Sequence, residues 1–164
     1  MATNGTGKGT GKAAAAGEGK EDVSGLRPVA YLTADIHLCQ TPPPCRAGES
    51  SAVVRGGWLG VQAGYLRQLR SLCQAAGCPL VIAGDIFDRW NASAELINMA
   101  MRELPEHTYA IPGQHDLPYH ALSHMDRSAF GTLVEAGRVT LIPPEGVFSH
   151  KSAGVRFYGK PWGE

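Results

Sequence analysis

Three short polar clusters carry the residue types of a metal site. They are Asp35-Ile36-His37, Gly84-Asp85-Ile86-Phe87-Asp88 and Gly113-Gln114-His115-Asp116. Each cluster follows an apolar, strand-like run, and ligands of parallel sheets bind beyond the carboxyl ends of the strands. Carboxylate oxygens and imidazole nitrogens suit manganese, iron, zinc and similar ions. Any one cluster alone could be a turn or a helix cap. Together the three predict a metal centre.

The first two clusters offer the strongest ligands. The one-residue spacing of Asp35 and His37 lets both side chains leave a strand end toward the same side. Asp85 directly follows the next strand-like run, and Gly84 permits a tight turn before it. A carboxylate has two oxygens, so Asp85 could bridge two metals about 3.5–4 Å apart, the arrangement of two-metal phosphoester cleavage.

The third cluster and its neighbours add a proton donor and substrate contacts. Gln114 offers a neutral carbonyl oxygen, and His115 is either a ligand or a proton donor. Asp88 is placed to hydrogen-bond His115 and to fix its tautomer. Arg89 either contacts a phosphate or forms a surface ion pair. His120 either lines a substrate cleft or lies on the surface of a loop or helix.

The elements that must position these clusters alternate between strand and helix. Apolar runs predict strands at residues 29–34, 80–83, 108–111, 139–142 and 155–158. Three- and four-residue apolar steps predict helices at about 59–76, 93–104 and 128–136, the first and last stopped by Gly77 and Gly137. Strands separated by helices of this length predict an α/β fold with a largely parallel sheet.

Composition narrows the class of protein. The chain has 164 residues, 43% of them apolar, and a formal net charge of zero, which gives no sign of a general polyanion-binding surface. No apolar run approaches a membrane span, and the N-terminus lacks a signal-peptide core. Four scattered cysteines without a CxxC pair indicate reduced thiols and a cytoplasmic setting. Residues 1–25, rich in Gly, Ala, Lys and Thr, predict a disordered tail.

The order D-x-H, G-D-x-x-D, G-Q-H-D resembles the calcineurin-like metallophosphoesterases, whose third motif is usually G-N-H-D/E. The stretch PGQHDLPYH at residues 112–120 is similar to phage and bacterial members. Over residues 28–164, the resemblance implies an α/β/β/α sandwich that hydrolyses phosphomonoesters or phosphodiesters. It also implies two divalent transition metals that activate a water, with manganese the first expectation and iron or zinc the alternatives.

The resemblance also implies a role for each matching residue. His115 protonates the leaving alkoxide or stabilises the phosphoryl charge, and Asp88 orients it. The implied ligands are Asp35 and His37 for the first metal, Asp85 for both metals, and Gln114 for the second metal in place of the usual Asn. Gln114 is one methylene longer than Asn, so the second metal is expected to be displaced or held weakly.

One departure from the family pattern bears on whether the chain can be catalytically active. The family completes its site with a later His and a G-H-x-H segment, and this sequence has neither match. We therefore expect an incomplete, truncated domain. DNA phosphodiesters are the first substrate expectation, with nucleotide phosphodiesters or phosphoproteins as competitors. The alternative is a catalytically incompetent remnant that binds metal weakly or acts only as an interaction domain. The sequence leaves the oligomeric state open.

Overall fold

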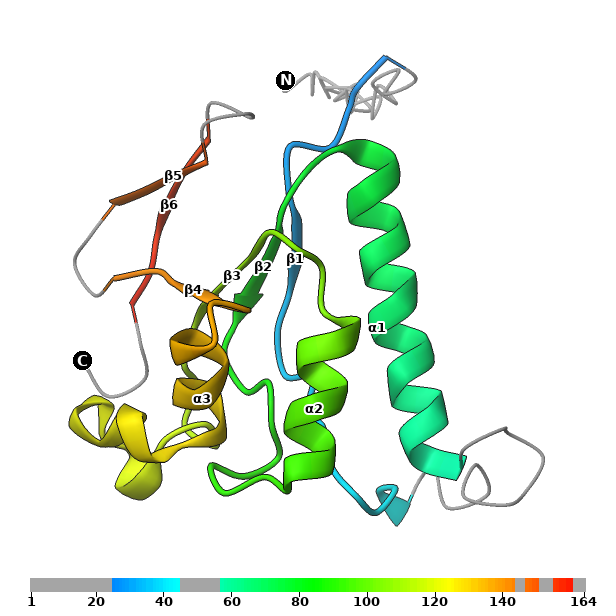
Figure 1. Ribbon diagram of the computed structural model, residues 1–164. Coiled ribbons are helices and arrows are strands. Elements are labelled where there is room, and N and C mark those ends of the chain that lie inside the picture. The colour runs from blue at the N-terminus through cyan, green and yellow to red at the C-terminus, as the bar shows by residue number, and fades with distance from the viewer. Residues whose placement is uncertain (1–24, 45–56, 144–146, 151–154, 161–164) are drawn as a thin grey trace, which may run out of the picture.

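The computed structural model describes residues 25–44, 57–143, 147–150 and 155–160 (Figure 1). Apart from Gly25, the predicted N-terminal tail lies outside these residues. In chain order the elements are β1 (Tyr31–Thr33), α1 (Gly57–Ala76), β2 (Leu80–Ala83), α2 (Ala94–Glu103), β3 (Thr108–Ile111), the 3-10 helices η2 (Pro118–His120) and η3 (Leu122–Arg127), α3 (Ala129–Glu135), β4 (Thr140–Leu141), β5 (Val147–His150) and β6 (Val155–Tyr158).

The main sheet has four strands in the order β1-β2-β3-β4, and every pair is parallel. Leu80 of β2 pairs with Tyr31 of β1 on one side and with Thr108 of β3 on the other. The helices between successive strands supply the crossovers that parallel pairing requires. The predicted parallel α/β sheet is therefore confirmed.

Side chains of the central strands alternate between two apolar clusters on the two faces of the sheet. Leu80, Ile82 and Ala110 join the core beneath the helices, whereas Val81 and Tyr109 join a smaller cluster on the opposite face. This alternation is the two-residue period of a strand whose two faces are both covered. The strands that present the polar clusters are thereby held from both sides.

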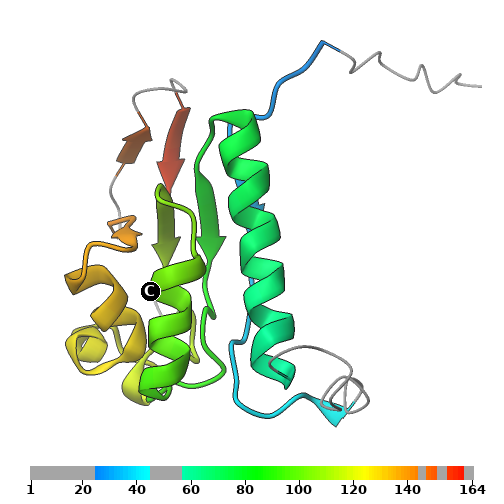
Figure 2. The same cartoon turned by 45° about the vertical axis from the view of Figure 1, so that its right-hand side comes forward.

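The three α-helices lie side by side on one face of the sheet (Figures 1 and 2). Gly77, with a φ of +64°, ends α1, and the Cys78 N–H bonds the carbonyl of Cys73 at 3.1 Å. This is a Schellman cap, in which glycine takes the left-handed position without a Cβ penalty. The hydroxyls of Ser93 and Ser128 accept N–H bonds at the starts of α2 and α3.

The opposite face is covered in part by the antiparallel pair β5–β6, which lies beyond β4 and away from α1 (Figure 1). Phe157 of β6 stacks on Tyr109 of β3 with ring centroids 6.3 Å apart. The strand β5 was not predicted. On this face of the main sheet, the side chain of Leu32 in β1 is 75% exposed, so among the described residues nothing covers the β1 side of the face. No helix among the described residues is long and apolar enough to cross a membrane.

Candidate metal centre

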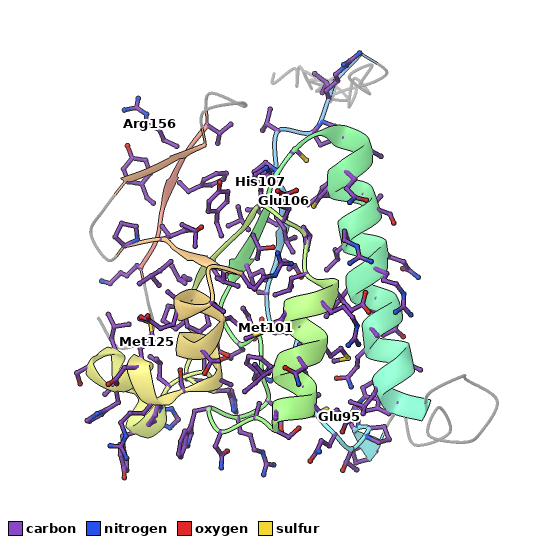
Figure 3. All side chains as sticks on the ribbon, viewed as in Figure 1. Glu95, Met101, Glu106, His107, Met125 and Arg156 are labelled. Atoms are coloured by element: carbon purple, nitrogen blue, oxygen red, sulfur yellow. The ribbon has the colours of Figure 1, made fainter. Side chains whose placement is uncertain are left out.

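All three polar clusters follow the carboxyl ends of neighbouring strands. Asp35 follows β1, Asp85 follows β2, and Gln114 follows β3. Figure 3 marks both ends of the molecule: Glu106 and His107 lie where β3 begins, and Glu95 lies at the opposite end, where α2 begins. The parallel order of the three strands thus brings segments about 50 and 30 residues apart in sequence to one edge.

Asp35, His37 and Asp85 form the candidate metal site. Each offers one ligand atom, and these atoms lie within 4.8 Å of one another. His37 Nε2 is 3.7 Å from Asp35 Oδ1. Asp85 is only 8% exposed, whereas the side chain of Asp35 is 71% exposed, so the group opens to solvent on one side. A hard carboxylate pair with one imidazole suits a divalent transition metal.

The donor set gives a test of whether a cation fits. His37 Nε2 lies 3.7 Å from Asp35, whereas its buried Nδ1 lies 3.8 Å from Asp88 Oδ1 and has no hydrogen-bond partner within the described part of the chain. The fit therefore depends on Nε2 and the two carboxylates. Two carboxylates and one imidazole within 4.8 Å of one another fit a divalent metal held at the ends of β1 and β2.

The backbone at these three residues is unusual. Asp35, His37 and Asp85 have φ angles of +52°, +49° and +53°, in the left-handed region that L-residues with a Cβ avoid. Such conformations concentrate at functional sites, where surrounding contacts hold them in place. Here the Asp35 N–H bonds the carbonyl of Gly84 at 3.1 Å, and the His37 N–H bonds the carbonyl of Asp85 at 3.0 Å. The two loops therefore fix each other.

Two glycines allow the second and third clusters to touch. A Cβ on Gly84, whose φ is +90°, would lie 2.9 Å from the Cα of Gly113. A Cβ on Gly113 would overlap the carboxylate and the backbone nitrogen of Asp85. This close approach lets the His115 N–H bond Asp85 Oδ1 at 2.8 Å. Asp85 is thus oriented by the third cluster before any metal binds.

Asp116 links the loop after β2 to the loop after β3 through buried hydrogen bonds. It is fully buried, and its carboxylate accepts N–H bonds from Ile86, Phe87 and Gly113 at 3.2, 3.1 and 3.0 Å. Burial raises the pKa of Asp116 to about 6, and these hydrogen bonds lower it only partly. Sequence reasoning gave Asp116 no role. Its signal was the position three residues after a turn glycine, where Asp often bonds nearby backbone N–H groups.

The structure places His115 beside the metal group. Its ring lies edge-on to the ring of His37, with centroids 5.0 Å apart and an interplanar angle of 77°. The side-chain nitrogen Nε2 of Gln114 lies 3.3 Å from His115 Nε2. Both residues therefore reach the edge of the cluster. Their roles, as proton donor and as ligand of a second metal, remain predictions.

Asp88, Arg89 and His120 lie around this group, and Arg89 forms the ion pair that was one of its two predicted alternatives. Asp88 Oδ1 is 3.8 Å from His37 Nδ1, and its Oδ2 is 3.6 Å from Arg89 Nη2, so Asp88 lies between His37 and Arg89. The orienting role of Asp88 toward His115 stays a prediction. His120 Nδ1 is 2.8 Å from the carbonyl of Gln114, which makes His120 a support of the third cluster. Substrate contacts of Arg89 and His120 also stay predictions.

Comparison with known proteins gives the class of this chain. Residues 30–160 match the family described as calcineurin-like phosphoesterase. The match covers most of the sequence, and the chain belongs to this family. No curated protein matches it. Among solved structures, it is similar to the protein of unknown function AQ665 from Aquifex aeolicus, with 16% identity and a TM-score of 0.40. That similarity covers 77% of this chain and 56% of AQ665.

Proposed function

We propose that this protein is a metal-dependent phosphoester hydrolase. The observation that supports this most is the meeting of Asp35, His37 and Asp85 within 4.8 Å at the carboxyl edge of the parallel sheet. Membership of the calcineurin-like phosphoesterase family supports the same reaction class. Fold alone does not define a function, so the proposal depends on this site.

The proposed ligands divide between two metals. Asp35 and His37 hold the first, Asp85 contributes to both, and Gln114 completes the second. Manganese is the first choice, with iron or zinc as alternatives. When bound, such cations polarise phosphoryl oxygens and lower the pKa of water. What the chain itself supplies is a set of ligands whose backbone is fixed before binding.

His115 is the proposed general acid. Its backbone N–H is bonded to Asp85 and its ring lies edge-on to that of His37, so the ring lies beside the proposed metal ligands, where an acid for the leaving alkoxide is needed. A protonated imidazole can deliver one proton to the leaving oxygen as the ester bond breaks, and the ring is then left neutral. Because its ring also approaches His37, loss of His115 tests whether it is an acid or a ligand.

The proposed substrate is a phosphodiester, first of all DNA or a nucleotide, and the proposed compartment is the cytoplasm. The choice of substrate is more specific than the family membership and depends on the resemblance of the third cluster to phage and bacterial members. The choice of compartment depends on the four scattered cysteines. A second candidate is a metal-binding domain without activity. The exposure of Asp35 and the presence of three ligand groups in the described cluster favour this second candidate.

Hydrolysis of bis-p-nitrophenyl phosphate separates the two candidates. After removal of metals by a chelator, we expect manganese to restore hydrolysis, and Asp85→Asn to abolish it. Asp126→Asn, an equivalent change on the exposed surface of η3, is the matched control and should leave the rate unchanged. Metal binding without any hydrolysis would support the inactive candidate instead.

The variant His115→Ala tests the assignment of the acid. We expect a rate at least about a hundredfold lower, the usual effect of losing a general acid, with the manganese content retained. The rate and the bound metal are measured on the same preparation. Loss of a metal together with the rate would make His115 a ligand.

A further inference from the structure

An apolar cavity of about 430 Å³ opens directly beside the metal group. It lies between the loop that follows β1 and the first turns of α1. This volume is within the range of small-molecule sites, which are typically 300–1,000 Å³. Its wall is mostly apolar because it is lined by two apolar residues, Ile36 and Pro43, and by two aromatic residues, Trp58 and Tyr65.

The cavity is continuous with the proposed site because the two share a residue. His37, whose Nε2 is 3.7 Å from Asp35, is also part of the cavity wall. Asp88 lines the cavity beside it and lies 3.8 Å from His37 Nδ1. The cavity therefore adjoins the place where the metal ligands would hold a phosphoryl group, so an ester group of the substrate has space there.

The wall of the cavity is held by specific hydrogen bonds. Gln62 is 4% exposed, and its amide both accepts the Cys39 N–H at 2.9 Å and donates to the Cys39 carbonyl at 2.8 Å. The Trp58 indole N–H donates to Cys39 Sγ at 3.4 Å. These bonds attach the loop after β1 to α1, so the cavity is a built feature of the fold.

We propose that this cavity binds the organic group of the phosphoester and that this group is a planar ring, as in an aryl ester or a nucleobase. The inference rests on the proposed function and specifies its substrate. Trp58 and Tyr65 offer aromatic surfaces for stacking, which tolerates any flat ring. Among the described residues of the wall, the only formally charged residue besides His37 is Asp88, so an anionic organic group finds no lysine or arginine partner in that part of the wall.

Binding of two phosphonates tests the preference for a ring. In the manganese-loaded full chain, calorimetry should show phenylphosphonate binding at least about tenfold more tightly than methylphosphonate, since aromatic stacking is worth about 1–3 kcal/mol. Trp58→Ala should remove this preference, and Trp58→Phe should keep most of it. Trp90→Ala, which removes an aromatic ring outside the cavity wall, is the control and should keep it fully. Equal binding of both phosphonates, or a preference that survives Trp58→Ala, overturns the proposal.

Alkylation of Cys39 gives a readout that does not depend on the metals. Cys39 lines the cavity and is a free thiol. Phenol should slow its alkylation by N-ethylmaleimide, as located by mass spectrometry, whereas cyclohexanol should slow it less. If neither phosphonate binds but phenol protects Cys39, the proposed function fails while the ring site stands. If phenol gives no protection and phenylphosphonate no preference, the ring site itself is wrong.

Discussion

Asp35, His37 and Asp85 combine ligand chemistry with a left-handed backbone. Each such conformation costs about 1–2 kcal/mol for a residue with a Cβ. The cost is met by contacts from other loops, above all the N–H bonds to Gly84 and Asp85 and the packing of Gly84 on Gly113. The site therefore consists of three strained residues whose positions are held by the backbone of neighbouring loops.

Gly113→Ala should displace the proposed metal ligand Asp85 by steric overlap. The new methyl group would overlap the Asp85 carboxylate and backbone nitrogen, so Asp85 must move. We expect a loss of about 1–3 kcal/mol in the free energy of unfolding, as for other overpacked positions, and weaker manganese binding. Urea unfolding and calorimetry measure the two effects.

Gly64→Ala is the matched control for Gly113→Ala. Gly64 lies within α1, and a Cβ there meets nothing within 4 Å. This change should stabilise the protein by about 0.5–1 kcal/mol and leave metal binding unchanged. Equal metal binding by both alanine variants would contradict the proposed role of Gly113.

At the scale of elements, a buried carboxylate joins α1 to α2. Glu103 is 5% exposed and contacts three arginines: Arg67 at 3.2 Å, Arg70 at 3.3 Å and Arg102 at 3.0 Å. Burial by itself raises the pKa of Glu103, but the hydrogen bond from Arg102 and the charges of Arg67 and Arg70 lower it below its usual value. The helices that cover the sheet are thus linked by charge as well as by packing.

Glu103→Gln should destabilise the protein by about 1–3 kcal/mol at neutral pH, because the arginines lose a buried charged partner. The pKa of Glu103 is lowered on folding, so its contribution is complete above the unfolded value of about 4.3 and is lost as pH falls through the folded value. Urea unfolding at pH 7 and at pH 3 measures this. A difference between wild type and variant that is unchanged at pH 3 would contradict it.

The elements were predictable because their patterns are local. The strands at 80–83, 108–111 and 155–158 match β2, β3 and β6, and the helix predicted at about 93–104 matches α2 with Ser93 as its cap. The carboxyl-edge position of all three clusters then followed from parallel order. β5 was missed because only its first two residues, Val147 and Phe148, are apolar, so the strand is defined by its pairing with β6 rather than by an apolar run. The contacts of Asp88 and Asp116 depend on loop conformation, which residue spacing does not encode.

At the scale of the whole molecule, the two faces of the sheet differ in cover. The helices cover one face, where the central strands are buried, while the other face contacts β6 through Phe157 and Tyr109 and leaves Leu32 exposed. The metal group lies at the carboxyl ends of β1 and β2. The pair β5–β6 therefore supports the strands that carry the site without contributing a proposed ligand from its described residues.

Phe157→Ala should lower the free energy of unfolding by about 1–3 kcal/mol. This is less than the same substitution costs at a fully buried phenylalanine, because Phe157 is half-buried. The neighbouring Tyr158 is 73% exposed, and Tyr158→Ala should change stability by less than about 0.5 kcal/mol. Thermal unfolding followed by circular dichroism compares the two. Equal effects would show that β6 does not cover the sheet as described.

We propose that Asp35, His37 and Asp85 hold a divalent cation, and a manganese titration of the chelator-treated protein tests this claim. Calorimetry should show saturable binding that Asp85→Asn weakens at least about tenfold, or 1.4 kcal/mol. Asp126→Asn should bind as the wild type does. Absence of saturable binding, or equal binding by wild type and Asp85→Asn, would contradict the claim.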